Sequence, residues 1–173
     1  MTKDELVDIV DESENFLEVV SKQEAHKKGL LHKTVIGVVM DSRGRWLLVR
    51  QAKHKQDAGQ YVSPVGGHVS AGEDNIKALK REAYEEIGLK EDFKYELIGK
   101  NIFNRYTIGR QENHLFIVYK IFSDTEPILN GDEDDGYRYF TEEELIKELK
   151  ENPKLFGDAF HFGVKIFFPH LYL

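Results

Sequence analysis

Apolar residues along the chain alternate with polar ones in short runs, and this pattern predicts paired strands. Residues 4–20 alternate weakly on either side of an acidic turn at 11–15, which predicts a small hairpin. Residues 34–40 and 46–50 are rich in apolar side chains and flank an Asp-Ser-Arg-Gly turn, which predicts a second hairpin. Further strands are expected at residues 93–102, 114–122 and 137–140.

Capping residues mark the beginnings of several helices. Ser21 followed by Glu24 is a capping-box pattern, so a short helix is expected to begin there and to end near residue 28, before Gly29. A threonine cap precedes an expected helix at residues 142–150. The aromatic segment 156–168 is also expected to be helical and to pack on the body of the protein.

The longest helix is expected from about residue 73 to residue 87. Its apolar positions recur at helical spacing and face a core, namely Ile76, Leu79, Ala83 and Ile87. Gly88 follows the last of them and ends the helix. Residues 51–72 contain Pro64 and several glycines, so they are expected to form a loop.

Together these elements predict an α+β fold in which a mixed β-sheet lies between α-helices, an α/β/α sandwich. The length of 173 residues suits one domain spanning 1–173. Within it we expect an N-terminal extension at 1–33, a core at 34–150 and a C-terminal helical segment at 151–173.

Composition and charge narrow the functional classes. The chain contains no cysteine, which excludes a disulfide framework, a thiolate metal site and a cysteine nucleophile. A formal net charge of −7 argues against nonspecific binding to nucleic acid. The acidic N-terminus lacks the apolar region of a signal peptide, and no stretch is long enough to span a membrane. A cytoplasmic protein without membrane or nucleic-acid partners is therefore expected.

Three carboxylates of the long helix share one face, because Glu82, Glu85 and Glu86 are spaced i, i+3 and i+4. Like charges packed this closely repel one another. A hard divalent cation such as Mg²⁺ prefers such oxygen ligands. The pattern therefore predicts a metal site on this helix, with a solvated face of ordinary charge pairs as the alternative.

The segment GHVSAGEDNIKALKREAYEEIGL, residues 67–89, resembles the Nudix box at every fixed position of that family's pattern. The resemblance covers about residues 34–150 and implies a loop-helix-loop that holds Mg²⁺ or Mn²⁺ while water attacks a diphosphate. The ligands it implies are Glu82, Glu85 and Glu86. The glycine turn before the helix can also bring the Gly67 carbonyl near the metal. The family positions with structural roles are Glu73, Arg81 and Gly88, and Arg81 is expected to pair with Glu73 or to orient a helix glutamate.

A general base can come from outside the box. Glu133 in the acidic segment 130–136 is the preferred candidate, ahead of Asp134 and Glu112. An ordinary acidic surface loop is the alternative.

A basic segment before the box can reach substrate phosphates. Its residues are Arg50, Lys53, His54 and Lys55, and the alternative is a solvated basic turn. Tyr61 is expected to pack rather than to stack on a base. Aromatic residues that can line a nucleobase pocket, or belong to the core, are Phe103, Tyr106 and Tyr119.

A second resemblance extends over nearly the whole chain. The stretches VDESENFLEVVSKQEAHKKGLLHKTV and SPVGGHVSAGE resemble the isopentenyl-diphosphate isomerase branch of the Nudix superfamily. In that branch, histidines and two glutamates at matching positions form a metal site. The resemblance implies a second site here, made of His26, His32, His68, Glu112 and His114.

This chain departs from the isomerase pattern at two positions. Gly66 stands where the isomerases carry a catalytic cysteine, and His114 stands where they carry the second glutamate. Isomerisation needs an acid and a base on opposite faces of the substrate. The departures therefore oppose isomerase activity, whereas the hydrolase box is complete.

The histidines admit two interpretations. They can hold a transition-type metal, since imidazole suits Zn²⁺, Mn²⁺ or Fe²⁺, and the break at Gly29 would let His26 and His32 converge. The favoured interpretation is that they are loop histidines whose ring nitrogens are satisfied by hydrogen bonds.

The function expected from the sequence is a Mg²⁺- or Mn²⁺-dependent Nudix hydrolase. It would cleave a phosphoanhydride in a nucleoside diphosphate derivative or a related organic pyrophosphate, with that small molecule as its partner. The alternatives are an isopentenyl-diphosphate delta-isomerase and a catalytically inactive nucleotide-binding module, and the acidic charge disfavours an RNA-processing activity. An exposed edge strand or the aromatic C-terminus would suit a homodimer.

Overall fold

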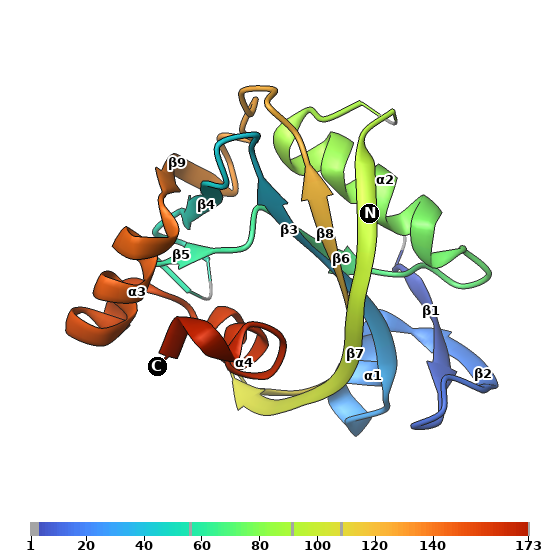
Figure 1. Ribbon diagram of the computed structural model, residues 1–173. Helices are drawn as coiled ribbons and strands as arrows, with labels where there is room; N and C mark the ends of the chain where they lie inside the picture. The colour runs from blue at the N-terminus through green and yellow to red at the C-terminus, as the bar shows by residue number, and fades with distance from the viewer. Residues whose placement is uncertain (1–3, 56, 91, 108, 173) are drawn as a thin grey trace.

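The computed structural model describes residues 4–55, 57–90, 92–107 and 109–172. Within them one curved, mixed sheet of nine strands is accompanied by four α-helices and two short 3₁₀ helices (Figure 1). In chain order the elements are β1 (Leu6–Val10), β2 (Phe16–Ser21), α1 (Lys22–Lys28), β3 (His32–Met40), β4 (Trp46–Gln51), β5 (Tyr61–Val62), β6 (Val65–His68), α2 (Asn75–Ile87), β7 (Lys94–Thr107), β8 (Arg110–Phe122), β9 (Asp134–Phe140), α3 (Glu142–Glu151), η1 (Pro153–Leu155), α4 (Asp158–Phe167) and η2 (Pro169–Tyr172).

Strand β3 lies at the centre of the sheet. It pairs in parallel with β8, from His32 opposite His114 to Met40 opposite Phe122. It also pairs antiparallel with β6, where Thr34 is opposite His68, and it contacts β1 and β4. Strand β7 extends the sheet beyond β8, and β9 pairs with β4. This pairing brings segments far apart in sequence to the beginning of β3.

The two faces of the sheet carry separate cores. On β3, Val35 and Val39 belong to a cluster that α2 covers with Ala78, Leu79 and Ala83. Between them, Val38 belongs to a second cluster, to which α3 and α4 contribute Leu145, Leu149, Phe160 and Val164. Because neighbouring residues of a strand point to opposite faces, the sheet lies between α2 and the C-terminal helices. The expected α+β sandwich is confirmed.

The caps of α1 and α2 explain where these helices begin. Ser21 accepts a hydrogen bond from the Glu24 N–H, and Gly29 ends α1 with a φ of 67°, as the sequence predicts. Helix α2 starts later than the expected residue 73. Asp74 is its N-cap and accepts hydrogen bonds from the second and third helical N–H groups, while Glu73 bonds to Arg81 instead.

Two segments that the sequence does not predict as strands form strands in the structure. Residues 51–72 contain β5 and β6, and the glycine-rich β6 is held by pairing with β3 rather than by its own strand propensity. Strands β7 and β8 pair from Lys94 opposite Phe122 to Thr107 opposite Arg110, so most of the segment between the two predicted strands also forms a ladder. Within the described residues, no helix is long and apolar enough to cross a membrane.

Candidate functional site

Arg81 organises the carboxylates of α2. Its Nε and Nη2 donate to the two carboxylate oxygens of Glu73 at 2.9 Å each, as the sequence predicts. Its Nη1 donates to Glu82 Oε1 at 2.7 Å and to Glu85 Oε2 at 3.4 Å. Its Nη2 also donates to the backbone carbonyl of His68 at 3.0 Å. The Arg81 guanidinium therefore holds the acidic face of α2 against strand β6, which contains the glycine turn.

Gly67 makes room for the Glu82 carboxylate. A Cβ atom placed on Gly67 would lie 2.2 Å from Glu82 Cδ and Oε1. A side chain at this position would therefore displace the carboxylate. Glu82 is itself buried, and burial, followed by the Glu85 charge, raises its pKa despite the opposing effect of Arg81. The sequence predicts that the glycine turn brings the Gly67 carbonyl near a metal, and the packing of Glu82 is a separate, steric reason for a glycine at this position.

Glu86 carries an uncompensated charge when it is ionised. Burial first, and then the carboxylates of Glu82, Glu133 and Asp134, raise its pKa to about 10. The Gly66 N–H donates to its Oε2 at 3.2 Å. Across the described residues no cationic side chain forms an ion pair with Glu86, in contrast to Glu82 and Glu85. A cation bound here would relieve this crowding of negative charge.

Glu86 opens into a cavity of about 310 Å³. Glu133, Gly66 and Gly67 line the cavity with it, so the structure brings the expected base and the box together. Most of the remaining wall is apolar, with side chains from β3, β8, α4 and the residue that follows α4, namely Ile36, Val38, Phe116, Val118, Phe160, Val164 and Phe168. The site therefore has an acidic end and an apolar body.

Glu133 and Asp134 differ in their surroundings. Glu133 accepts a hydrogen bond from Lys55 Nζ at 3.3 Å and keeps part of its carboxylate exposed. Asp134 is buried and accepts a hydrogen bond from Gln51 at 3.1 Å, and burial, then the Glu133 charge, raises its pKa to about 6. Glu133 lines the cavity, whereas Asp134 is not among the lining residues. Glu133 is therefore the better placed of the two.

The basic residues before the box do not converge on the cavity. Arg50 donates to Asp135 Oδ1 at 2.6 Å, and Lys53 is exposed. Lys55 donates a hydrogen bond to Glu133, which lines the cavity, but Lys55 does not line the cavity itself. None of the three is among the described residues that line the cavity.

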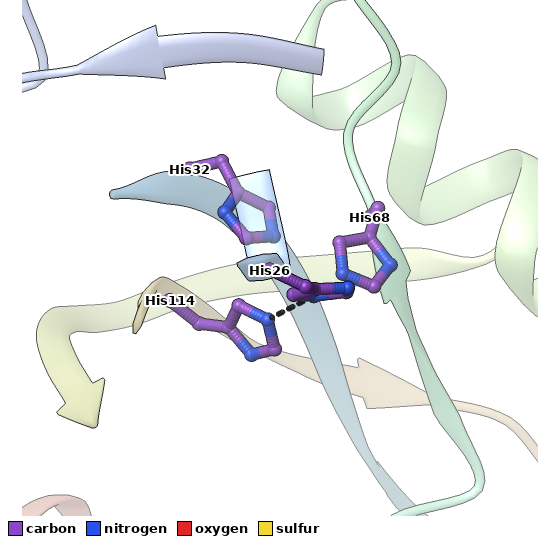
Figure 2. A group of neighbouring side chains, drawn as sticks. All are labelled: His26, His32, His68 and His114. Carbon is purple, nitrogen blue, oxygen red and sulfur yellow. Dashed lines mark hydrogen bonds between the residues drawn. The ribbon is translucent and has the colours of Figure 1, made fainter. Parts of the chain in front are cut away.

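Four histidines, His26, His32, His68 and His114, converge from four different elements, α1, β3, β6 and β8 (Figure 2). We call them the histidine cluster. One ring nitrogen of each lies within 4.8 Å of those of the others. Pairing of β3 with both β6 and β8 places three of the residues side by side, and α1 brings the fourth.

The favoured interpretation of these residues as satisfied loop histidines is wrong. All four lie in regular elements, and the Nε2 atoms of His32 and His68 are buried without a hydrogen-bond partner. Burial, the largest cause at each residue, lowers the pKa of His26 to about 4 and that of His114 to about 2. Burial therefore favours the neutral form of each ring, and the four imidazoles could together hold a metal ion.

Glu112 lies beside the cluster but faces two arginines. Its carboxylate accepts hydrogen bonds from Arg105 at 3.2 Å and Arg110 at 3.0 Å. Its Oε2 is 3.9 Å from His114 Nδ1, beyond hydrogen-bond range. The structure thus separates Glu112 from the four nitrogen donors with which the sequence resemblance grouped it.

Sequence reasoning missed the contribution of α4 to the site. Phe160, Gly163 and Val164 line the cavity, although the sequence indicates only that this segment packs on the body. Asp57 also lines the cavity and lies 3.8 Å from Arg105. No local signal marks these residues, because their place depends on how the chain returns to the sheet. Tyr61 packs edge-on against Phe140, as expected.

Comparisons with known proteins show the family to which the chain is similar. A family model described as the NUDIX domain matches residues 30–160. The chain is 31% identical over 155 residues to an isopentenyl-diphosphate Delta-isomerase of Pectobacterium atrosepticum, covering 86% of this chain and 83% of that protein. It is 36% identical over 86 residues to an uncharacterized Nudix hydrolase of Yersinia pestis, covering 49% of this chain and 47% of that protein.

Solved structures share the fold. DR0079 from Deinococcus radiodurans superposes with a TM-score of 0.73 at 20% identity, covering 98% of this chain and 100% of that one. A MutT protein from Methanosarcina mazei superposes with a TM-score of 0.63 at 21% identity, covering 82% of this chain and 92% of that one.

Proposed function

The chain belongs to the Nudix family, and we propose that it is a metal-dependent hydrolase that cleaves a phosphoanhydride bond in a small organic pyrophosphate. The observation that carries this proposal is the position of Glu86. It stands beside Glu82 on α2, it opens into the cavity, and it has no cationic partner among the described residues. Negative charge gathered at the end of a pocket suits a cation that in turn holds a diphosphate.

The residues of α2 fit Mg²⁺ or Mn²⁺. Glu82, Glu85 and Glu86 offer carboxylate oxygens, and Gly67 offers a backbone carbonyl on the facing strand. When bound, such a metal neutralises phosphate charge and lowers the pKa of coordinated water. The raised pKa values of Glu82 and Glu86 support this assignment, because a bound cation stabilises the ionised carboxylates.

The chain's own residues have three roles in this proposal. Arg81 holds Glu82 and Glu85 in position through its hydrogen bonds. The Gly66 N–H orients the Glu86 carboxylate. Glu133 faces the same cavity and accepts the proton of the attacking water, and Lys55 forms an ion pair with its carboxylate.

The cavity supports a substrate whose organic group is largely apolar. Its body is lined by valine, isoleucine and phenylalanine side chains, and Gln51 and Ser63 add polar groups. The basic segment before the box does not line it, so recognition of the phosphates falls mainly to metal ions. Among the substrates expected from the sequence, the lining favours a related organic pyrophosphate over a nucleoside with many polar groups.

Isopentenyl-diphosphate isomerisation is the second candidate, and the similarity to the Pectobacterium isomerase favours it. Against it stands Gly66, which occupies the position of the isomerase cysteine in a chain without cysteine. A catalytically inactive nucleotide-binding module is the third candidate. It would bind ligand in the cavity without turnover.

Turnover of a substrate panel by wild type and Glu86→Gln tests the proposal. The panel contains nucleoside diphosphate derivatives, alkyl diphosphates and isopentenyl diphosphate, each with Mg²⁺ and with Mn²⁺. Glu86→Gln should lower kcat on the order of 100-fold or more, because it removes a charged ligand at the reacting phosphates. The matched control is Glu143→Gln, the same change on the exposed face of α3. Wild-type turnover by Glu86→Gln would contradict the metal assignment.

A further inference from the structure

We propose that Gly163 on α4 determines the size of the substrate's organic group, and that this group is an extended alkyl chain packed against the helix at that residue. The inference rests on the proposed function, because it takes the diphosphate to lie at the acidic end of the cavity. Three observations carry it: the face that α4 presents to the cavity, a glycine that the fold itself does not require, and an unpaired hydroxyl on the facing strand.

One face of α4 lines the cavity. Its lining residues recur at helical spacing, namely Ala159, Phe160, Gly163 and Val164. Phe160 and Val164 are buried in the core between α4 and the sheet. Gly163 lies one turn after Ala159, so two small residues follow one another along the cavity side of the helix. They leave a recess in the apolar wall, which we call the α4 notch.

The fold does not require glycine at position 163. The backbone there is not in the left-handed conformation that favours glycine. A Cβ at this position would meet no described atom within 4 Å outside the backbone of its own helix, whereas a Cβ on Gly99 would lie 2.7 Å from the Phe167 ring. Glycine inside a helix destabilises it relative to alanine. The open volume at Gly163 therefore has a cost that packing within the protein does not explain, and a ligand that fills it does.

Both ends of α4 are held in place. The N–H of Gly157, the N-cap residue, donates to the Tyr61 carbonyl oxygen at 3.0 Å. After the helix, Phe168 packs edge-on against Trp46, with ring centres 4.9 Å apart. The wall formed by α4 is thus anchored, and the residue at 163 sets the depth of the notch.

The strand that faces α4 carries an unpaired hydroxyl. Thr34, Ile36 and Val38 alternate along β3 and line the cavity from the same face of the sheet. Thr34 is 8% exposed, and among the described residues its Oγ1 has no hydrogen-bond partner. A buried hydroxyl without a partner costs free energy, and a ligand oxygen that reaches it removes that cost. The wall opposite α4 is therefore also incomplete without a ligand.

The Gly163 end of the cavity is apolar. Asp57 lines the cavity beside the start of α4, where a Cβ on Gly157 would lie 3.2 Å from its carboxylate carbon. Gly163 is almost two turns further along the helix, next to the lining residues Val164 and Phe168. An alkyl chain is therefore the organic group that suits this end.

The size of the cavity makes the residue at 163 decisive. Its volume of about 310 Å³ lies at the small end of the roughly 300–1,000 Å³ that is usual for ligand pockets. One added side chain would therefore remove a large share of the space for the organic group. Each methylene group that the notch buries strengthens binding about fourfold.

Binding of analogues that cannot be hydrolysed tests the proposal without turnover. The probes are butyl, hexyl and octyl methylenediphosphonates with Mg²⁺, measured by isothermal titration calorimetry on the full chain. Wild type should bind the hexyl compound about 16-fold more tightly than the butyl compound, and the octyl compound more tightly again. Equal affinity for the three chains, or no binding of any, would overturn the proposal.

Variants of α4 locate the contact. Gly163→Leu fills the notch, so its affinity for the octyl compound should fall at least about tenfold while the butyl compound binds as it does to wild type. The matched control is Lys165→Leu, which adds the same side chain on the exposed face of the same helix and should keep the wild-type preference. Equal octyl affinity in wild type and Gly163→Leu would overturn the assignment.

Gly163→Ala keeps the test decisive if Gly163→Leu does not fold. It should raise the midpoint of thermal unfolding by about 1–4 °C, because alanine suits a helix better, and weaken octyl binding about fourfold. Unchanged octyl affinity in this variant would count against the proposal. Turnover of the substrate panel decides the hydrolase separately. Length-dependent binding without any turnover would uphold the role of Gly163 and overturn the hydrolase.

Discussion

Gly67→Ala should disrupt the acidic site on α2 while the protein still folds. The new Cβ would lie 2.2 Å from Glu82 Cδ, whereas carbon atoms pack at about 3.5 Å or more, so the carboxylate must retreat by about 1.3 Å. Mg²⁺ demands near-ideal octahedral geometry, and a misplacement of about 1 Å near reacting groups can cost about 100-fold in rate. We therefore expect kcat in Mg²⁺ to fall on the order of 100-fold.

The neighbouring glycine provides a matched comparison. A Cβ on Gly66 would meet only the Val35 carbonyl oxygen, at 3.7 Å, which is an ordinary contact. Gly66→Ala makes the same chemical change in the same strand, and its kcat should fall far less than that of Gly67→Ala. The assay is product release from whichever panel member the wild type cleaves, with circular dichroism to verify folding. Equal losses of kcat in the two variants would refute the steric reasoning.

Two further predictions concern charged residues around the site. Asp134→Asn should raise the free energy of unfolding at pH 8 by roughly 1–2 kcal/mol and have little effect at pH 4. Burial, and then the Glu133 charge, raise the pKa of this carboxyl from an ordinary value of 3.8 to about 6 in the fold. The folded state therefore loses stability as the pH rises from about 4 to about 6, and the loss is complete at pH 8. Urea unfolding at both pH values measures this, and equal effects at both would contradict it. Arg81→Lys should lower kcat roughly tenfold, because one ammonium cannot replace the forked contacts to Glu73 and Glu82, and unchanged turnover would contradict that role.

The acidic helix is predictable from the sequence because its determinants are local. The spacing of Glu82, Glu85 and Glu86, and the glycine that ends the helix, follow from residues within a few turns of one another. Even here the helix starts after the expected residue 73. Asp74 is the N-cap that residue type favours, and Glu73 pairs with Arg81 two turns along the helix.

The histidine cluster and the cavity are harder to predict because their determinants are distant. His32 and His114 meet only through the parallel pairing of β3 with β8, which no periodicity in either strand encodes. Strand β6 is glycine-rich and looks like loop until its pairing with β3 is known. The apolar wall that α4 adds depends likewise on the return of the chain to the far face of the sheet.

Hydrolysis in ¹⁸O-labelled water tests the central claim most directly, with each panel member that wild type consumes in Mg²⁺. Attack of water on phosphorus predicts one labelled oxygen per turnover in a phosphate product, with the phosphoanhydride bond broken and the organic group left as a phosphate monoester. Conversion of isopentenyl diphosphate to an isomer with an intact, unlabelled diphosphate would contradict the account and establish the isomerase. Binding of panel members without any labelled product would contradict it as well, in favour of an inactive binding module.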